Sequence, residues 1–181
     1  MIAGVSIFTA IVIVLQFLGS FIRFGPFSIS LTLIPIVVGA AVYGPAAGAW
    51  LGFVFSLIVL FTDSAAFLVV NFWGTVITVL AKGTLAGFVA GLVYKAFSNN
   101  KTLAVFLAAI SCPVTNTGIF VIGCYLWFMP TIAAWAEGAG FSSSASFLFT
   151  GMIGLNFLFE LLVNVILSPV IVRVIEMGKK D

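Results

Sequence analysis

Charged side chains inside long apolar segments are the residues of this chain most able to do chemistry. The chain is 63% hydrophobic and 7% charged, yet Lys82 and Glu160 both lie well inside apolar stretches. A lone charge in the middle of a bilayer costs at least ~2.5–3.5 kcal/mol on insertion scales, so such charges usually pair with one another or face a ligand. A lysine ammonium can bind a carboxylate, and a glutamate can balance that lysine.

Amide and hydroxyl side chains recur at helical spacing around these two charges, which places them on one face of each predicted helix. At about 1.5 Å per residue, Lys82, Asn116 and Glu160 reach the same depth from three different segments. The predicted substrate-binding residues are Asn71, Thr75, Thr78, Lys82, Asn116, Asn156, Glu160 and Asn164.

Two interpretations of this polar set stand side by side. In the first, Lys82 and Glu160 form a structural ion pair that holds two helices together. In the second, they form the floor of a pocket that opens to the outside, and the remaining polar residues form its walls.

Composition excludes several other classes of function. The chain has no His and two Cys, so a tetrahedral zinc site is nearly impossible, and we expect no metal, cofactor or catalytic residue. A net charge of +2 without a basic run argues against a nucleic-acid partner. No Walker A motif is present, so the chain has no ATP site of its own. Cys112 and Cys124 are predicted to be buried thiols of one helix, too far apart to bridge within it.

Gly, Pro and polar clusters divide the chain into six predicted transmembrane helices within a single domain, residues 1–181. The approximate spans are 2–22, 28–43, 45–61, 70–94, 103–128 and 147–175. The second span is the weakest, because its clearly apolar part, residues 31–43, is shorter than the ~20 residues that cross a bilayer squarely. Either the helix extends back through residues 27–30, or a short helix leaves a loop that protein must cover.

The basic residues predict the orientation. With six spans, both termini share one side with Lys95 and Lys101, and that side holds five of the seven basic residues. The opposite side holds Arg23, and Lys82 lies within a span. The positive-inside rule therefore places both termini in the cytoplasm. The polar loops 23–30, 62–69 and 129–146 then face outward.

Small residues predict where helices pack. Gly83, Gly87 and Gly91 recur every four residues in the fourth span, and Gly48 and Gly52 have the same spacing in the third. In lipid, close backbone contact is a main attraction between helices, and small residues permit it. We expect these glycines to pack inside the chain.

Three motifs carry a resemblance to a known family. They are LTLIPIVVGAAVYGPAAGAWLG at 31–52, KGTLAG at 82–87 and NTGIF at 116–120. Together with the length and the six spans, they make the chain similar to the S-components of energy-coupling-factor (ECF) transporters, which are six-helix bundles that bind a vitamin. The resemblance extends over nearly the whole chain.

This resemblance implies the high-affinity substrate-binding subunit of an ATP-driven importer in the bacterial plasma membrane. Its ligand, a vitamin or related micronutrient, would enter from outside into a pocket built mainly from the last three helices and the outer loops. A transmembrane coupling subunit and two cytoplasmic ATPases would be its partners. The family docks through Ala-x-x-x-Ala in the first helix, where this chain has Ser6 and Ala10. The alternative for these two residues is packing inside the chain.

The ligand and the transport mechanism have alternatives. Lys82, if it does not only pair with Glu160, favours a ligand carboxylate, as in pantothenate or folate. The overall impression of the sequence favours a pantothenate-like member, and riboflavin, another vitamin or a nucleobase precursor are the alternatives. A self-sufficient secondary transporter would use Lys82 and Glu160 as coupling charges. Many such transporters contain inverted repeats, and the sequence has no convincing pair of halves.

Overall fold

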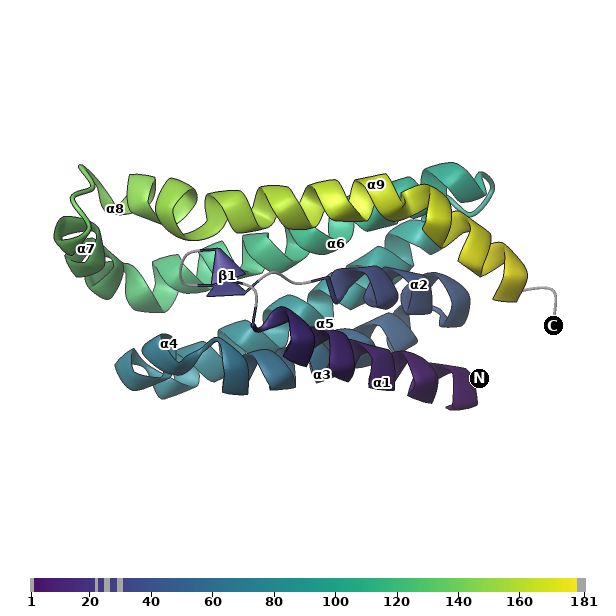
Figure 1. Cartoon of the computed structure of the whole chain (residues 1–181), viewed down its shortest axis with the longest axis horizontal. Coiled ribbons are helices and arrows are strands. Elements are labelled where there is room, and N and C mark those ends of the chain that lie inside the picture. Colours follow the sequence, from purple (N-terminus) through teal and green to yellow (C-terminus); the bar gives the residue numbers. More distant parts are fainter. Residues whose placement is uncertain (1, 22, 25–26, 29–30, 179–181) are drawn as a thin grey trace.

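The computed structural model describes residues 2–21, 23–24, 27–28 and 31–178 and forms a helical bundle with one short strand pair (Figure 1). In these residues, five helical stretches are long and apolar enough to cross a membrane. This finding confirms the predicted all-helical membrane class. The stretches are α1 (Ile2–Gly19), α3 (Pro45–Thr62), α5 (Phe72–Ala96), α6 (Lys101–Gly123) continuing through the π-helical η1 (Cys124–Phe128) and α7 (Met129–Gly138), and α8 (Ser144–Ser146) continuing through the π-helical η2 (Phe147–Gly154) and α9 (Leu155–Gly178).

The start of α1 and the end of α9 lie at the same end of the bundle. Figure 1 shows that the turn between α5 and α6 lies at this end too. This arrangement fits an even number of crossings with that turn on the side of the termini. The side of the membrane that this end faces stays a prediction.

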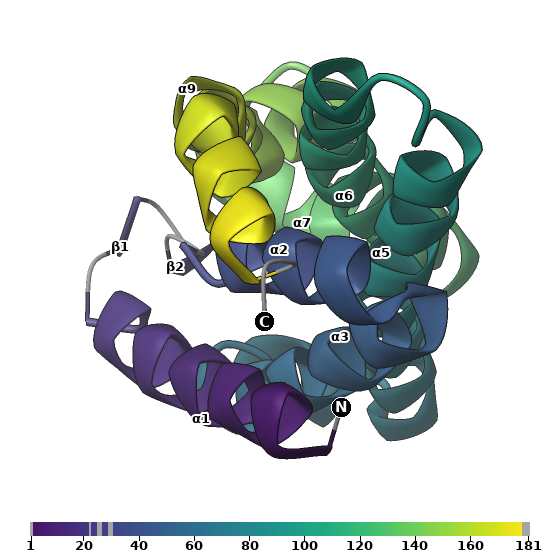
Figure 2. The same cartoon turned by 90° about the vertical axis from the view of Figure 1, so that its right-hand side faces the viewer.

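The second predicted span is a short helix, α2 (Leu33–Tyr43), of 11 residues. It does not extend back to residue 28, because β2 (Phe27–Ser28) pairs there antiparallel with β1 (Arg23–Phe24). At about 1.5 Å per residue α2 is ~16 Å long, roughly half of a bilayer core. Eight of its residues are buried, and Figure 2 shows α2 between α9 and α6 on one side and α1 and α3 on the other. Protein therefore covers the short helix, as the second alternative required.

A Gly-Pro pair makes the turn from α2 to α3. Gly44 has φ of 95°, in the left-handed region that favours glycine. Its N–H donates to the Ala40 carbonyl at 3.0 Å and closes α2. Pro45 then takes the first position of α3, where its fixed φ suits a helix start and no N–H donor is needed.

Helices α3 and α5 pack backbone against backbone along a seam of glycines. A Cβ added to Gly48 would overlap the Gly87 carbonyl, and one added to Gly52 would overlap the Gly83 carbonyl. Gly91 continues the seam against the start of α3. The prediction that these glycines pack inside the chain is confirmed, since a side chain at any of them would separate the two helices.

The predicted outer loops contain helices that the sequence analysis did not identify: α4 (Ala65–Val70) and α7. For α7 the sequence does contain a helical pattern. Phe128, Ile132 and Ala136 recur every four residues, which is the spacing of one helix face, and all three are buried. Phe128 packs against Phe67 of α4 with ring centroids 5.0 Å apart, and Ile132 joins the same hydrophobic cluster. The segment 129–146 is therefore not a plain polar loop.

The main hydrophobic core surrounds α2 and includes Ile36, Leu51, Val79 and Cys112. Cys112 and Cys124 are both buried free thiols, as predicted from their positions in one apolar helical stretch.

Candidate binding site

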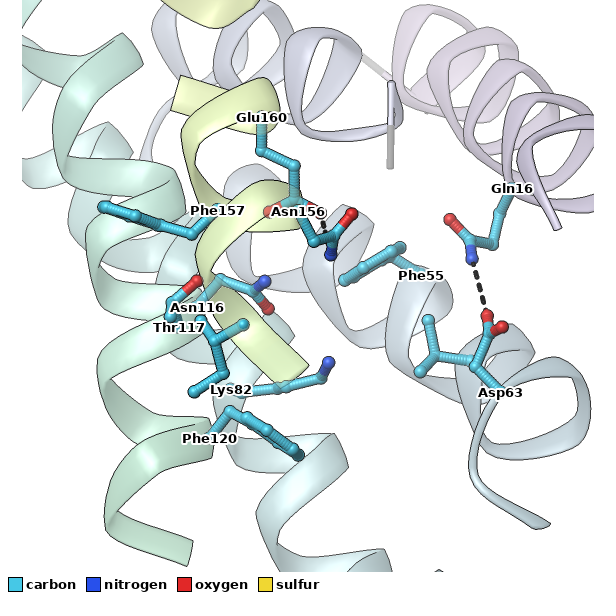
Figure 3. A pocket seen from close by; sticks show the side chains of 12 residues that line it. Gln16, Phe55, Asp63, Lys82, Asn116, Thr117, Phe120, Asn156, Phe157 and Glu160 are labelled. Atoms are coloured by element: carbon cyan, nitrogen blue, oxygen red, sulfur yellow. Dashed lines mark hydrogen bonds between the residues drawn. The ribbon is translucent and has the colours of Figure 1, made fainter. Parts of the chain in front are cut away.

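A cavity lies inside the bundle where side chains of α1, α3, α5, α6 and the α9 stretch meet (Figure 3). Its empty space, counted with the open solvent at its mouth, is about 520 Å³. Charged and amide side chains make up half of its lining. These are Gln16, Asp63, Lys82, Asn116, Asn156 and Glu160.

Four of the eight predicted substrate-binding residues line this cavity: Lys82 from α5, Asn116 from α6, and Asn156 and Glu160 from α9. Helical spacing predicted that these helices bring their polar faces to one level. The last three long helices contribute most of the lining and α1 and α3 contribute the rest, in agreement with the arrangement that the family resemblance implied.

Two further predicted residues, Thr75 and Thr78, are buried beside a smaller cavity of about 330 Å³. Lys82 and Phe120 line both cavities. These two side chains therefore form part of the partition between the main cavity and its neighbour.

The last two predicted residues, Asn71 and Asn164, line neither of these cavities in the described structure. Asn71 is the N-cap of α5, and its Oδ1 accepts a hydrogen bond of 2.9 Å from the Gly74 N–H. Such a cap satisfies a backbone donor that has no partner within the helix. Asn164 is buried in α9 and donates from Nδ2 to the Glu160 carbonyl at 2.8 Å.

Lys82 supplies positive charge to the cavity. Its Nζ lies 5.4 Å from the centroid of the Phe120 ring, a distance at which the face of the ring attracts a cation. The two acidic residues of the lining, Glu160 and Asp63, lie at the same cavity. Glu160 itself is 3% exposed. A direct contact between Lys82 and Glu160 stays a prediction.

Two asparagines of the lining, Asn116 and Asn156, each have an Oδ1 that is buried without a hydrogen-bond partner among the described residues. Asn156 does use its Nδ2, which donates to Oε1 of Glu160 at 3.4 Å. A buried acceptor without a partner costs ~1–3 kcal/mol. Both oxygens are therefore positions where a bound donor would be stabilising.

A polar network that the residue pattern did not predict lies on the side of the cavity away from α6 (Figure 3). Gln16 of α1 donates from Nε2 to Oδ2 of Asp63 at 3.4 Å, and its Oε1 accepts from the Thr32 hydroxyl at 3.0 Å. The Thr62 hydroxyl donates to the same Asp63 oxygen at 2.9 Å. The sequence contained one indication of this network. Gln16 is the one amide or charged side chain in the first apolar segment, and a polar residue inside a membrane span usually has a partner.

Apolar side chains, including Phe55, Val59, Ile153 and Phe157, complete the wall. Among the described residues, no cluster of three or more His, Cys, Asp or Glu side chains could hold a metal ion. The cavity thus suits an organic molecule that has both polar groups and an apolar part.

The predicted docking residues lie elsewhere, on the outer surface of α1. Ser6 and Ala10 are both exposed, so the structure does not place them in the packed interior, the alternative that the sequence left open. The Ser6 hydroxyl donates to the Ile2 carbonyl of its own helix at 3.1 Å. Its hydrogen bond is thus satisfied locally, and the residue presents a small surface to a neighbour.

Fold and cavity together define a small multi-pass membrane protein that can hold an amphiphilic solute inside its own helices. The chain belongs to the family described as "ECF transporter, substrate-specific component", whose sequence profile matches residues 1–172. It is therefore a non-catalytic, substrate-binding subunit of an ECF transporter, and the family role replaces the alternative of a self-sufficient transporter.

Among curated proteins, the chain is similar to the pantothenic acid transporter PanT of Lactococcus lactis subsp. cremoris (strain MG1363). The two are 30% identical over an alignment that covers 99% of this chain and 95% of that protein. No solved structure matched the chain.

Proposed function

We propose that this subunit binds pantothenate in the cavity around Lys82 and presents it to an ECF module for ATP-driven import. The observation that carries this proposal is the position of Lys82, which is the one cation that lines the cavity among the described residues. Pantothenate combines a carboxylate with a branched apolar part, hydroxyls and an amide. The relative named as a pantothenic acid transporter supports the same ligand.

In this proposal the Lys82 ammonium binds the ligand carboxylate through a charge-assisted hydrogen bond. Such a contact is stronger in a cavity enclosed by protein than in water, because the effective dielectric constant is lower there. The branched methyl groups of the ligand would pack against Phe55 and Phe157, which line the same cavity. High affinity would result from burying both parts of the ligand between helices.

The test begins with the purified subunit from cells grown with pantothenate. Mass spectrometry of the material that copurifies should identify pantothenate, and calorimetry on the emptied protein should give tight binding. Riboflavin and folate serve as comparison ligands and should bind far more weakly. Copurification of a different vitamin, or tighter binding of either comparison ligand, would replace pantothenate as the substrate.

We also infer that Ser6 and Ala10 contribute to the surface that docks onto the transmembrane coupling subunit, with two cytoplasmic ATPases completing the transporter. Of the 18 residues of α1, three are buried, so most of its surface is available for contact. Ala10→Trp should prevent assembly while pantothenate affinity stays unchanged, because Ala10 does not line the cavity. Leu18→Trp, at another exposed position of α1, is the control and should assemble normally. Equal loss of assembly and ligand binding in the Ala10 variant would contradict a docking role.

A further inference from the structure

We propose that Asn116 and Asn156 are the specificity-determining residues of the cavity, and that they accept hydrogen bonds from hydroxyl donors of the ligand. The inference rests on the proposed function for the choice of test ligand. It goes further by stating which chemical groups, besides a carboxylate, a molecule needs in order to be accepted.

Asn116 carries the first acceptor. The residue is 6% exposed, and Figure 3 shows its amide leaving α6 toward the cavity. Its Oδ1 has no hydrogen-bond partner in the described structure. An apolar residue of similar size would avoid the free-energy cost of burying an amide without a hydrogen bond. A ligand that donates a hydrogen bond to this oxygen would offset that cost.

Asn156 carries the second acceptor, and a neighbour fixes the orientation of its amide. The NH₂ group of Asn156 is the end that faces Glu160, because Nδ2 donates to Oε1 of Glu160 at 3.4 Å. The carbonyl end then points away from Glu160. It is buried without a partner among the described residues. Glu160 therefore presents the Asn156 oxygen as an acceptor.

The other amide of the cavity does not have this property. Both ends of the Gln16 amide are already engaged, with Thr32 and with Asp63. Lys82 adds donors rather than acceptors. The two asparagine oxygens therefore need hydrogen-bond donors, which the ligand would supply. A molecule of the same shape without them would leave the two asparagine oxygens desolvated and unpaired, which is how binding sites reject such analogues strongly.

The experiment compares pantothenate with its dideoxy analogue, in which hydrogen replaces both hydroxyls while the carboxylate, the amide and the methyl groups stay. Calorimetry on the wild-type protein should show the analogue binding at least about tenfold more weakly. Asn116→Leu and Asn156→Leu should each weaken pantothenate at least about tenfold, and the variant that has lost the acceptor should discriminate less between the two ligands.

Asn164→Leu is the matched control. Asn164 is a buried asparagine of the same α9 and also bonds to Glu160, but through the backbone carbonyl, and it does not line the cavity. This variant should keep the wild-type preference for pantothenate. Asparagine variants at 116 and 156 that weaken both ligands by the same factor would overturn the proposal.

Melting temperatures without ligand separate this proposal from the identity of the substrate. Asn116→Leu should melt no lower than the wild type, because it removes a buried amide oxygen without a partner. Asn164 also has a buried Oδ1 without a partner in the described structure, but its Nδ2 donates to the Glu160 carbonyl, so Asn164→Leu should melt lower than Asn116→Leu. If the wild type bound neither ligand, pantothenate would be the wrong substrate, and the acceptor role would be decided by melting. A marked fall for Asn116→Leu would show that the amide serves the fold.

Discussion

Replacing Lys82 and Glu160, singly and together, tests the electrostatics of the cavity most directly. Lys82→Met keeps most of the aliphatic stem and removes the ammonium, and Glu160→Gln keeps the shape and removes the charge. Glu160 is 3% exposed, and Lys82 lies within the cavity beside Phe120. If the two charges stabilise each other, each single substitution leaves a buried charge uncompensated at a cost of ~3–5 kcal/mol. The double variant should recover much of that loss.

The same variants report on the ligand. Loss of a charge-assisted contact between Lys82 and the ligand carboxylate should cost ~1.5–3 kcal/mol, which weakens binding by about 10- to 150-fold. Four proteins, the wild type, both single variants and the double variant, form a double-mutant cycle. The cycle is measured twice, by melting temperature without ligand and by calorimetric titration with pantothenate.

The mutual stabilisation of the two charges and the contact of Lys82 with the ligand have separate tests. A stable double variant that binds pantothenate with wild-type affinity would remove Lys82 from the binding site and leave a structural ion pair. Single variants that melt like the wild type would instead show that the two charges do not depend on each other.

Three further outcomes follow from the packing, capping and charge pattern of the chain. Gly52→Leu should melt far below the wild type, because a side chain there overlaps the backbone of α5, whereas Gly118→Ala, at a position with open space around it, should melt like the wild type. Asn71→Ala should lose about 1 kcal/mol of stability with its helix cap and keep its pantothenate affinity; a matching loss of affinity would place Asn71 in the site. In a cysteine-free background, Ser143→Cys should react with an impermeant reagent on intact cells and Asn99→Cys only after permeabilisation, and the reverse pattern would invert the orientation.

Helical spacing predicted much of the cavity because it fixes the direction of side chains along each helix. Lys82, Asn116 and Glu160 could be assigned to one level in this way. Spacing does not state where a cavity ends. Asn164 shares a helix face with Glu160 but lies one turn further along, outside the lining, and Asn71 bonds to its own helix start instead.

The rest of the site depends on contacts between distant segments. Gln16 and Asp63 are 47 residues apart and meet because α1 packs beside the end of α3. Next to Ser64, Asp63 resembles an ordinary loop residue in the sequence. The short α2 was undecided for a similar reason, since its burial on all sides is a property of the whole bundle and not of its own residues.

The glycine seam between α3 and α5 has a mechanical consequence for this cavity. Backbones in direct contact leave no layer of side chains that could repack, so the two helices form a stiff plate that carries Phe55 and Lys82. The α9 stretch lies across the cavity from this pair and contains the π-helical segment η2, and π-helical turns are frequent at functional sites. We expect spin-label distances between α3 and α5 to stay constant when pantothenate binds, while distances from α3 to α9 change; movement within the plate would contradict this. The ligand would then enter and leave through a movement of α9 relative to the rigid pair of α3 and α5.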